Sequence, residues 1–380
     1  MKILLVGAGG YGAGYVTTLL ENSDPTIIFE GVVDHCISAS VKKDALAAAG
    51  IPVYSTMEDF YREHTADLAI ICTPPFLHKE HSICALKHGS YVMCEKPVAP
   101  TVEDAEAMLR AEEEYGRWIA IGYQWSFSEQ IQNIKRDILD GKLGKPISLK
   151  CAISWPRGLD YYSRGSGWAG RICKDGVMML DSIASNACAH YIHNMLFLLG
   201  KSMDESAEVE DIEGVYLRAN SIESFDTCTI KMKAGGAELY IAASHAAEKE
   251  RWPEFVYKFE NATLTYVEDE GGEVVATMAD GTTRSYGILP KHTRAKVWDC
   301  INAIREGTTP VCTVKTALPH TRVIKRIFEK IAIKDFPVEL VAFDEKKKRV
   351  YVRGLYEKMY EAYENESMLE SLRGSCHAFA

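Results

Sequence analysis

The feature that most constrains the fold is the glycine run that ends the first apolar segment. Lys2–Val6 is a short apolar run of strand length. It is followed directly by GxGxxG, whose glycines are Gly7, Gly9 and Gly12, and a helical pattern then continues to Leu20. The first glycine permits a tight turn, the second lets the backbone approach a pyrophosphate, and the third lets the helix pack closely on the strand. Because a helix N-terminus also offers free N–H groups to phosphates, the segment predicts a dinucleotide-binding unit.

A carboxylate at the end of the next strand gives a second signal. The β-rich run IIFEGVVDHC ends near Asp34, about 20 residues beyond the glycines, where this type of site has an acid. Such a carboxylate accepts hydrogen bonds from the ribose hydroxyls of NAD and repels the 2′-phosphate of NADP. The alternative is an Asp that only caps the following helix. Together with the glycines, Asp34 favours NAD as the cofactor.

Strands and helices alternate over residues 1–123, which predicts a doubly wound parallel sheet. We expect helices at 38–48, 57–64, 76–88 and 102–115, with strands between them. Ligands of such sheets bind outside the carboxyl ends of the strands. The side chains expected to cluster there are Asp34, Thr73, Pro74, Glu95, Lys96, Tyr123 and Gln124.

The pattern changes after Lys145, where long β-rich runs follow one another. They predict a second domain, residues 124–380, of the α+β class with a large, open, mainly antiparallel sheet. We expect one face of this sheet to be covered by helices and the other to be free. Helices are expected at 294–306, 314–333 and 355–372.

Composition excludes several classes of protein. The chain of 380 residues has a net charge of −10 and no basic stripe, which argues against a nucleic-acid binder. No apolar run approaches the roughly 20 residues that span a bilayer, and the N-terminus does not read as a signal peptide. The 11 cysteines include no CxxC pair, which favours reduced thiols and a cytoplasmic location over disulfides or structural zinc.

The stretch NACAHYIH places Asn186, His190 and His193 at i, i+4 and i+7, one stripe of a helix that is otherwise apolar. These side chains could be metal ligands, catalytic groups or polar residues satisfied inside a core. Metal is the weakest alternative, because no carboxylate or cysteine falls at a compelling ligand spacing, although Asp175 or Asp181 could join the group.

The segment just before this stretch, WPRGLDYYSRGSGWAGR, is rich in aromatic residues, arginine and glycine. Aromatic rings stack on the aliphatic faces of sugars, and arginine donates to hydroxyls in a fixed fork. Arg164 and Arg171 could instead hold a carboxylated substrate, and an ordinary structured loop is the third alternative.

The motifs GAGGYG (Gly7–Gly12), TPPFLH (Thr73–His78), EKP (Glu95–Pro97) and the later NxxxHxxH occur in this order, with Asp34 after the first. With them the chain resembles the glucose–fructose oxidoreductase, inositol dehydrogenase and MocA (Gfo/Idh/MocA) family of NAD(P)-dependent sugar and polyol oxidoreductases. The resemblance implies that Lys96 is the residue closest to the chemistry. In physical terms, partial desolvation after a buried strand favours the neutral amine, which can exchange a proton with an alcohol. Glu95 could tune this balance.

The family's helix reads D-x-x-x-H-x-x-D before a closing glycine. Counting back from Gly200 puts Asn186, His190 and His193 at those positions, so the resemblance implies that His190 faces the substrate and works with Lys96. Asn186 cannot titrate and can only orient a hydroxyl. His193 replaces an acid and is expected to lie deeper, in a structural role. The family also uses the free sheet face for oligomer contacts, which implies a homo-oligomer, either a dimer or a tetramer.

The sequence therefore predicts an NAD-dependent oxidoreductase that acts on a secondary alcohol of a sugar, polyol or glycoside, without a metal. The alternatives are an NAD-dependent enzyme that cleaves glycosides by transient oxidation and elimination, and a non-catalytic NAD- or sugar-sensing protein. The predicted catalytic residues are Lys96 and His190. The predicted cofactor contacts are Gly7, Gly9, Gly10, Tyr11, Gly12, Asp34, Thr73, Pro74, His78, Glu95, Lys96 and Gln124. The predicted substrate contacts are Lys96, Tyr123, Trp155, Tyr162, Arg164, Trp168, Asn186 and His190.

Overall fold

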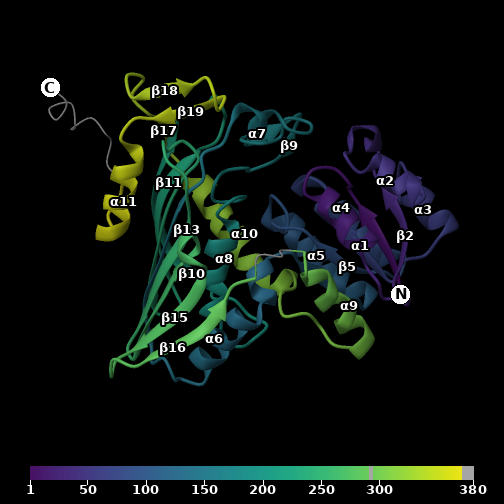
Figure 1. Cartoon of the computed structure of the whole chain (residues 1–380), viewed down its shortest axis with the longest axis horizontal. Coiled ribbons are helices and arrows are strands. Elements are labelled where there is room, and N and C mark those ends of the chain that lie inside the picture. Colours follow the sequence, from purple (N-terminus) through teal and green to yellow (C-terminus); the bar gives the residue numbers. More distant parts are fainter. Residues whose placement is uncertain (291–293, 370–380) are drawn as a thin grey trace. The chain divides into compact units, whose positions relative to one another are not determined.

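The computed structural model describes residues 1–290 and 294–369, which form two compact units (Figure 1). The first unit consists of Met1–Phe127 and the returning segment Lys291–Thr321, and the second of Ser128–Pro290 and Arg322–Ala380. The sequence placed a single boundary at residue 123 and did not anticipate the return. Helix α10 (Val314–Lys330) contains the point at which the first unit ends.

The first unit is built on a six-stranded sheet in which every pair of neighbouring strands is parallel. Its order is β3-β2-β1-β4-β5-β6. Strands such as β4 are buried along their whole length, as expected for a parallel sheet covered on both faces. The strands are β1 (Lys2–Val6), β2 (Ile28–Val33), β3 (Val53–Tyr54), β4 (Leu68–Ile71), β5 (Tyr91–Cys94) and β6 (Ile119–Ile121).

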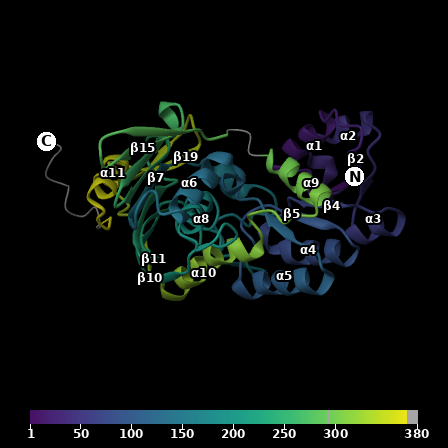
Figure 2. The ribbon, with the colours of Figure 1, turned by 90° about the horizontal axis from the view of Figure 1, so that it is seen from below.

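Helices lie on both faces of this sheet (Figure 2). One face packs against α1 (Gly12–Leu20) and α9 (Lys296–Glu306), whose apolar side chains share one core with the strands. Figure 2 shows α4 (His78–Lys87) and α5 (Val102–Tyr115) on the opposite side. The remaining elements are α2 (Lys43–Ala48), α3 (Met57–Glu63) and the 3₁₀ turns η1 (Ile37–Ala39), η2 (Pro75–Leu77) and η3 (Gln124–Phe127).

The second unit contains a nine-stranded mixed sheet with the order β16-β15-β14-β13-β7-β12-β11-β10-β17. The pairs β7–β12 and β10–β17 are parallel, and the other pairs are antiparallel. The predicted fold class, a Rossmann sheet followed by an α+β domain with a mainly antiparallel sheet, is confirmed. The strands are β7 (Pro146–Ser154), β10 (Val209–Arg218), β11 (Thr227–Ala234), β12 (Ala237–Ser244), β13 (Arg251–Phe259), β14 (Ala262–Val267), β15 (Glu273–Met278), β16 (Thr283–Ile288) and β17 (Ile333–Asp335).

Helices accompany both faces of the larger sheet, so the expectation of one free face was too simple. Both views show α11 (Leu355–Asn365) on the opposite side of the sheet from α8 (Ala189–Leu198). Met359 and Tyr363 of α11 pack against Ala152, Tyr240 and Ala242, which share one face of β7 and β12. The unit also contains α6 (Glu129–Leu139), α7 (Leu159–Ser163), η4 (Glu268–Glu270) and the hairpins β8–β9 (Cys173–Lys174, Val177–Met178) and β18–β19 (Val341–Asp344, Arg349–Val352).

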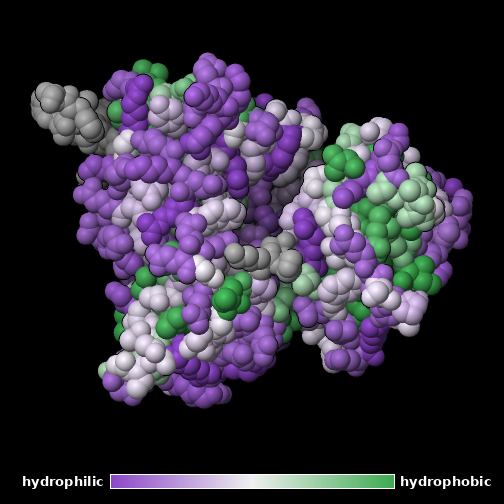
Figure 3. All heavy atoms as spheres, viewed as in Figure 1, coloured by the Kyte–Doolittle hydropathy of each residue, from purple (hydrophilic) through white to green (hydrophobic). Residues whose placement is uncertain are grey.

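The surface of the second unit is mostly hydrophilic in the view of Figure 3, with hydrophobic residues scattered over it. Of the helices that the structure describes, none combines the length and the apolar character needed to cross a membrane.

Candidate active site

The glycine loop has the geometry of a phosphate cradle. Gly7 has φ +90°, and a Cβ there would lie 2.7 Å from the backbone oxygen of Cys72, while a Cβ on Gly12 would lie 2.0 Å from that of Gly7. Glycine is therefore required at both positions. At Gly9 and Gly10, by contrast, no described atom lies within 4 Å of an added Cβ, and both residues are exposed. The loop backbone is open on this side, where a pyrophosphate can approach it.

Helix α1 begins at Gly12 without a side-chain cap and without an acidic residue in its first turn. No acidic side chain in the helix's own first turn therefore opposes an anion at this N-terminus. Tyr11, the residue before the helix, is 41% exposed. These observations fit the phosphates of a dinucleotide.

Asp34 lies directly after β2 and holds the glycine loop. Its two carboxylate oxygens accept hydrogen bonds from the backbone N–H groups of Ala8, at 2.9 Å, and Cys36, at 2.8 Å. The side chain is partly exposed, and carboxylate oxygens accept more than one hydrogen bond each. The helix-cap alternative does not describe this arrangement, because Asp34 links the strand end to the loop.

Lys96 follows β5 and its side chain is partly exposed, whereas its neighbour Glu95 is only 7% exposed. The Glu95 carboxylate accepts a hydrogen bond from the hydroxyl of Tyr15 and lies 2.7 Å from the ammonium of Lys296 on α9. Burial raises the pKa of Glu95, but the Lys296 charge and the hydrogen bonds outweigh it and hold the pKa below its ordinary value. Glu95 is therefore an ionised group balanced inside the unit. The sequence did not anticipate Lys296, although it is a charged residue at a buried position of an otherwise apolar helix face.

His78 is 1% exposed and joins two loops of the predicted cofactor site. Its ring nitrogens lie 2.9 Å from the carbonyl oxygen of Thr73 and 2.8 Å from that of Pro97. The Thr73 hydroxyl lies 3.1 Å from a ring nitrogen of His81. This environment gives His78 a positioning role, since it holds the loop after β4 to the loop that carries Lys96. Pro74 and Gln124 are partly exposed on the neighbouring loops.

Tyr123, a predicted substrate contact, is 1% exposed. Its hydroxyl lies 2.9 Å from a ring nitrogen of His320, also in the first unit. This placement favours a structural role for Tyr123.

In the second unit, Asn186 and His190 are the two partly exposed residues of a stretch from Asp181 to Gly200 that is otherwise buried. Helix α8 begins only at Ala189, so Asn186 lies in the preceding turns and the three polar side chains do not form one continuous helical stripe. His193 is 1% exposed and lies deeper than His190.

Asp181 supports this surface, a role that the sequence did not assign. Its carboxylate accepts hydrogen bonds from the Asn186 amide, at 3.0 Å, and from the backbone N–H of Gly170, at 2.6 Å. Leu180, just before it, has φ +44°, an uncommon backbone conformation for a residue with a side chain. Among residues 1–290 and 294–369, no group of three or more His, Cys, Asp or Glu side chains could hold a metal ion.

The aromatic and arginine-rich segment packs beside Asn186 and His190 within the same unit. The Trp155 ring lies 6.0 Å from that of Tyr191, the residue after His190. Arg164 stacks on Tyr161 at 3.6 Å and lies 5.0 Å from the Trp168 ring. The hydroxyl of Tyr162 is buried. The structure thus gathers the predicted cofactor residues in the first unit and most of the predicted substrate residues in the second.

Comparison with known proteins agrees with this fold. Residues 1–123 match the Gfo/Idh/MocA model of the oxidoreductase family, NAD-binding Rossmann fold. The inositol 2-dehydrogenase of Renibacterium salmoninarum is 30% identical over 153 residues, 40% of this chain and 45% of that protein. The glucose-6-phosphate 3-dehydrogenase of Bacillus subtilis is 26% identical over 149 residues, 39% of this chain and 41% of that protein. Each alignment thus spans less than half of the curated relative.

The fold extends over more of the chain than these sequence matches. The WlbA dehydrogenase of Bordetella pertussis, solved with NADH and UDP-GlcNAcA, has a TM-score of 0.69 at 22% identity, covering 87% of this chain and 95% of that one. Residues 1–123 therefore match the NAD-binding Rossmann domain of the Gfo/Idh/MocA family, as the sequence predicted, and NADH is bound in the similar WlbA structure.

Proposed function

We propose that the chain is an NAD-dependent oxidoreductase that transfers a hydride between a secondary alcohol of a sugar, polyol or glycoside and NAD. The observation that carries this proposal is the position of Lys96. It stands at the carboxyl end of β5, in the same unit and at the same sheet edge as the glycine loop and Asp34. The curated relatives named above are dehydrogenases of polyhydroxy compounds, which supports the same class of substrate.

The chain's own residues account for cofactor binding. The open backbone at Gly9 and Gly10 and the uncapped start of α1 receive the pyrophosphate, while Asp34 accepts from the ribose hydroxyls. NAD, when bound, supplies the hydride acceptor. We assign residues 1–123 to cofactor binding and residues 124–380 to substrate binding.

Lys96 removes the proton from the reacting hydroxyl. Glu95 is matched by Lys296, so its charge is already balanced by a cation other than Lys96. His190 shares the proton transfer from the substrate side, and Asn186, held by Asp181, orients a hydroxyl. The proposal requires Lys96 and His190 to face the same substrate.

The test is a screen of sugars, polyols and glycosides with NAD, in which absorbance of the reduced nicotinamide is followed. We expect reduction with at least one compound, and its loss in Lys96→Ala. Release of an aglycone without net NADH would favour the glycoside-cleaving alternative instead.

Two further predictions belong to this proposal. We propose that the chain forms a dimer or tetramer through the strands of the larger sheet. The interface excludes the part of β7 and β12 that α11 covers. Light scattering of the purified chain tests the oligomeric state. We also propose a cytoplasmic location. All the cysteines that the structure describes are free thiols, which supports it.

A further inference from the structure

Arg157 lies in the segment between β7 and α7, where two aromatic rings hold its guanidinium. Its central carbon is 5.3 Å from the centroid of Trp155 and 5.2 Å from that of Tyr161. Its backbone N–H donates to the carbonyl oxygen of His245 at 3.0 Å. Cation–π contacts of this kind leave the N–H groups of a guanidinium able to donate to an anion. Arg157 is thus preorganised for a planar anionic partner.

Within residues 1–290 and 294–369, Arg157 forms no ion pair, and its Nε is buried without a hydrogen-bond partner. The other two arginines of the segment differ. Arg171 pairs with Glu223 at 2.7 Å, and Arg164 donates to the carbonyl oxygen of Tyr161 at 3.0 Å. Arg171 thus has a counter-charge and Arg164 has a carbonyl partner, whereas, in the part of the chain that the structure describes, Arg157 has no acidic partner and a buried Nε that is not hydrogen-bonded.

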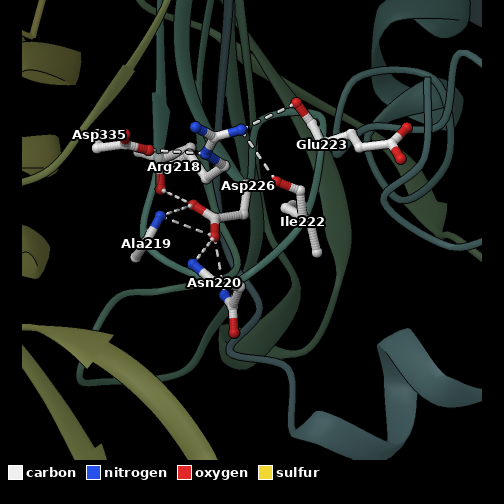
Figure 4. Close-up of polar contacts among 8 residues, drawn as sticks. Arg218, Ala219, Asn220, Ile222, Glu223, Asp226 and Asp335 are labelled. Carbon is white, nitrogen blue, oxygen red and sulfur yellow. Dashed lines mark hydrogen bonds and ion pairs between the residues drawn. The ribbon is translucent and has the colours of Figure 1, made fainter.

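The nearby carboxylates are occupied by the chain itself. Asp181 accepts from Gly170 and Asn186. The main-chain carbonyl of Asp226 accepts a hydrogen bond from the backbone N–H of His245. The Asp226 carboxylate accepts hydrogen bonds from Ala219 and Asn220 (Figure 4). Neither acid is an ion-pair partner of Arg157, which leaves its charge available to a ligand.

Three further buried polar atoms without a partner belong to the residues around Arg157. They are Nε1 of Trp155, the hydroxyl of Tyr162 and Nε2 of His245. The Tyr161 ring links this group, because it lies 5.1 Å from Tyr162 and 5.5 Å from His245. Buried polar groups are nearly always hydrogen-bonded, so several unpaired ones around one cation indicate a polar ligand.

The hydrogen-bonding roles of these atoms define the ligand's chemistry. Nδ1 of His245 lies 2.7 Å from the carbonyl oxygen of Trp155, so Nδ1 carries the proton and Nε2 is an acceptor. Burial, together with the Arg157 charge, lowers the pKa of His245 to about 3, which keeps the ring neutral. Burial raises the pKa of Tyr162, which keeps its hydroxyl a donor. Arg157, Tyr162 and Trp155 therefore donate, and His245 accepts.

We propose that Arg157, Tyr162 and Trp155 bind the carboxylate of the substrate and that His245 accepts a hydrogen bond from a hydroxyl next to it. The substrate is then a hydroxylated carboxylic acid, of the uronic or aldonic acid class. One arginine with two neutral donors matches the single charge of a carboxylate, whereas a phosphate dianion calls for more positive charge. The assignment rests on the proposed function, since it names the substrate class of that oxidoreductase.

The test compares matched compounds with the full chain and NAD. D-glucuronate and D-gluconate are set against D-glucose and D-glucitol, with glucose 6-phosphate as the second anion. We expect kcat/KM for at least one acid to exceed that of its neutral counterpart by roughly tenfold or more. In Arg157→Met, kcat/KM for that acid falls by roughly 10- to 100-fold, the range for a lost charge-assisted hydrogen bond, and the preference for the acid is lost. Arg171→Met, which removes the same charge from the ion pair with Glu223, serves as the matched control and keeps the preference.

Calorimetric binding of both acids to the NAD-loaded protein separates this inference from the proposed function. Acid binding that Arg157→Met and the milder Tyr162→Phe both weaken, in variants that retain the wild-type melting temperature, supports the subsite even without turnover. If neutral sugars reduce NAD as fast as the acids do, the proposed function stands but the proposed carboxylate subsite is wrong. Preference for glucose 6-phosphate, or the absence of binding by either acid, also overturns it.

Discussion

The ammonium of Lys296 lies 2.7 Å from Oε1 of Glu95, and both side chains are buried. Lys296 also donates to the carbonyl oxygen of Gly122 at 3.1 Å. The pair joins helix α9 to the end of β5, one residue before Lys96. Burial lowers the pKa of Lys296, but the Glu95 charge outweighs it and raises the pKa above its ordinary value.

Lys296→Met should therefore destabilise the fold by about 3–5 kcal/mol at pH 7, because it leaves an uncompensated charge on Glu95. Chemical denaturation measures this difference. Glu95→Gln combined with Lys296→Met should recover much of the loss, since no buried charge remains. If Lys296→Met alone is as stable as the wild type, Lys296 and Glu95 do not form a buried ion pair.

The pH dependence of this variant should be opposite to that of the wild-type pair. With Lys296 present, the lowered pKa of Glu95 contributes stability above the unfolded pKa, and this stability is lost as pH falls through the folded pKa. Without Lys296, burial is opposed only by the Tyr15 hydrogen bond and the Lys96 charge, so we expect the pKa of Glu95 to rise and its contribution to become unfavourable as pH rises. Lys296→Met should consequently lose less stability, relative to wild type, at pH 5 than at pH 8, as melting temperatures across this range would show.

Asp34 should determine the choice between NAD and NADP. Asp34→Ala removes the charge that repels a 2′-phosphate and also the hydrogen bonds to Ala8 and Cys36. We expect the NAD-over-NADP affinity ratio to fall by on the order of tenfold, about 1.4 kcal/mol. Asp34→Asn separates the effects, because it removes the charge but keeps an acceptor for the loop. Fluorescence titration with NAD and NADP measures these affinities. If the wild type binds NADP as tightly as NAD, the role assigned to Asp34 is wrong.

Lys96→Ala should lower turnover by roughly 100-fold or more, the scale of general acid–base catalysis, with little change in NAD affinity. Lys79→Ala provides the control, because Lys79 is another lysine of the first unit and pairs with Asp104 away from the strand end. Steady-state kinetics and cofactor titration together make the test. Nearly unchanged turnover in Lys96→Ala would reduce Lys96 to a loop residue.

Substitutions of His190 and His193 should differ in their effects, the first mainly on turnover and the second mainly on stability. His190→Ala changes a partly exposed side chain, so we expect a folded, NAD-binding protein with strongly reduced turnover. His193→Ala changes a buried one, and we expect a loss of stability of about 1–3 kcal/mol with a smaller effect on turnover. Melting curves and kinetics of both variants test the pair. The reverse pattern would exchange the two roles.

The sequence predicted what depends on local pattern. The glycine loop, Asp34 and the helix at Val102–Tyr115 are specified by neighbouring residues. In that helix the Thr101 hydroxyl accepts from the backbone N–H of Asp104, and Gly116 ends it with φ +63°. The start of α8 was misplaced, because an apolar run with polar residues at helical spacing looks the same whether the chain forms a helix or successive turns.

Contacts between distant segments could not be predicted. Lys296 contacts Glu95 only because the chain returns to the first unit, and its place on the apolar face of AKVWDCINAI does not identify its partner. Arg157 lies in the same segment as Arg164 and Arg171, but the sequence suggested only those two for a carboxylated substrate. Its neighbour Tyr162 lies on α7 and His245 directly follows β12, so the environment of Arg157 emerges only from the tertiary structure.

The central claim is hydride transfer from a carbinol carbon to NAD, and isotope transfer tests it most directly. The chain is incubated with NAD and an acid or sugar from the screen that carries deuterium at its carbinol carbons, and the nicotinamide is analysed by mass spectrometry. The account predicts reduced cofactor that has gained one deuterium, formed roughly 100-fold or more faster in the wild type than in Lys96→Ala. Cofactor that stays oxidised and unlabelled with every substrate, in protein that demonstrably binds NAD and releases no aglycone, would contradict it.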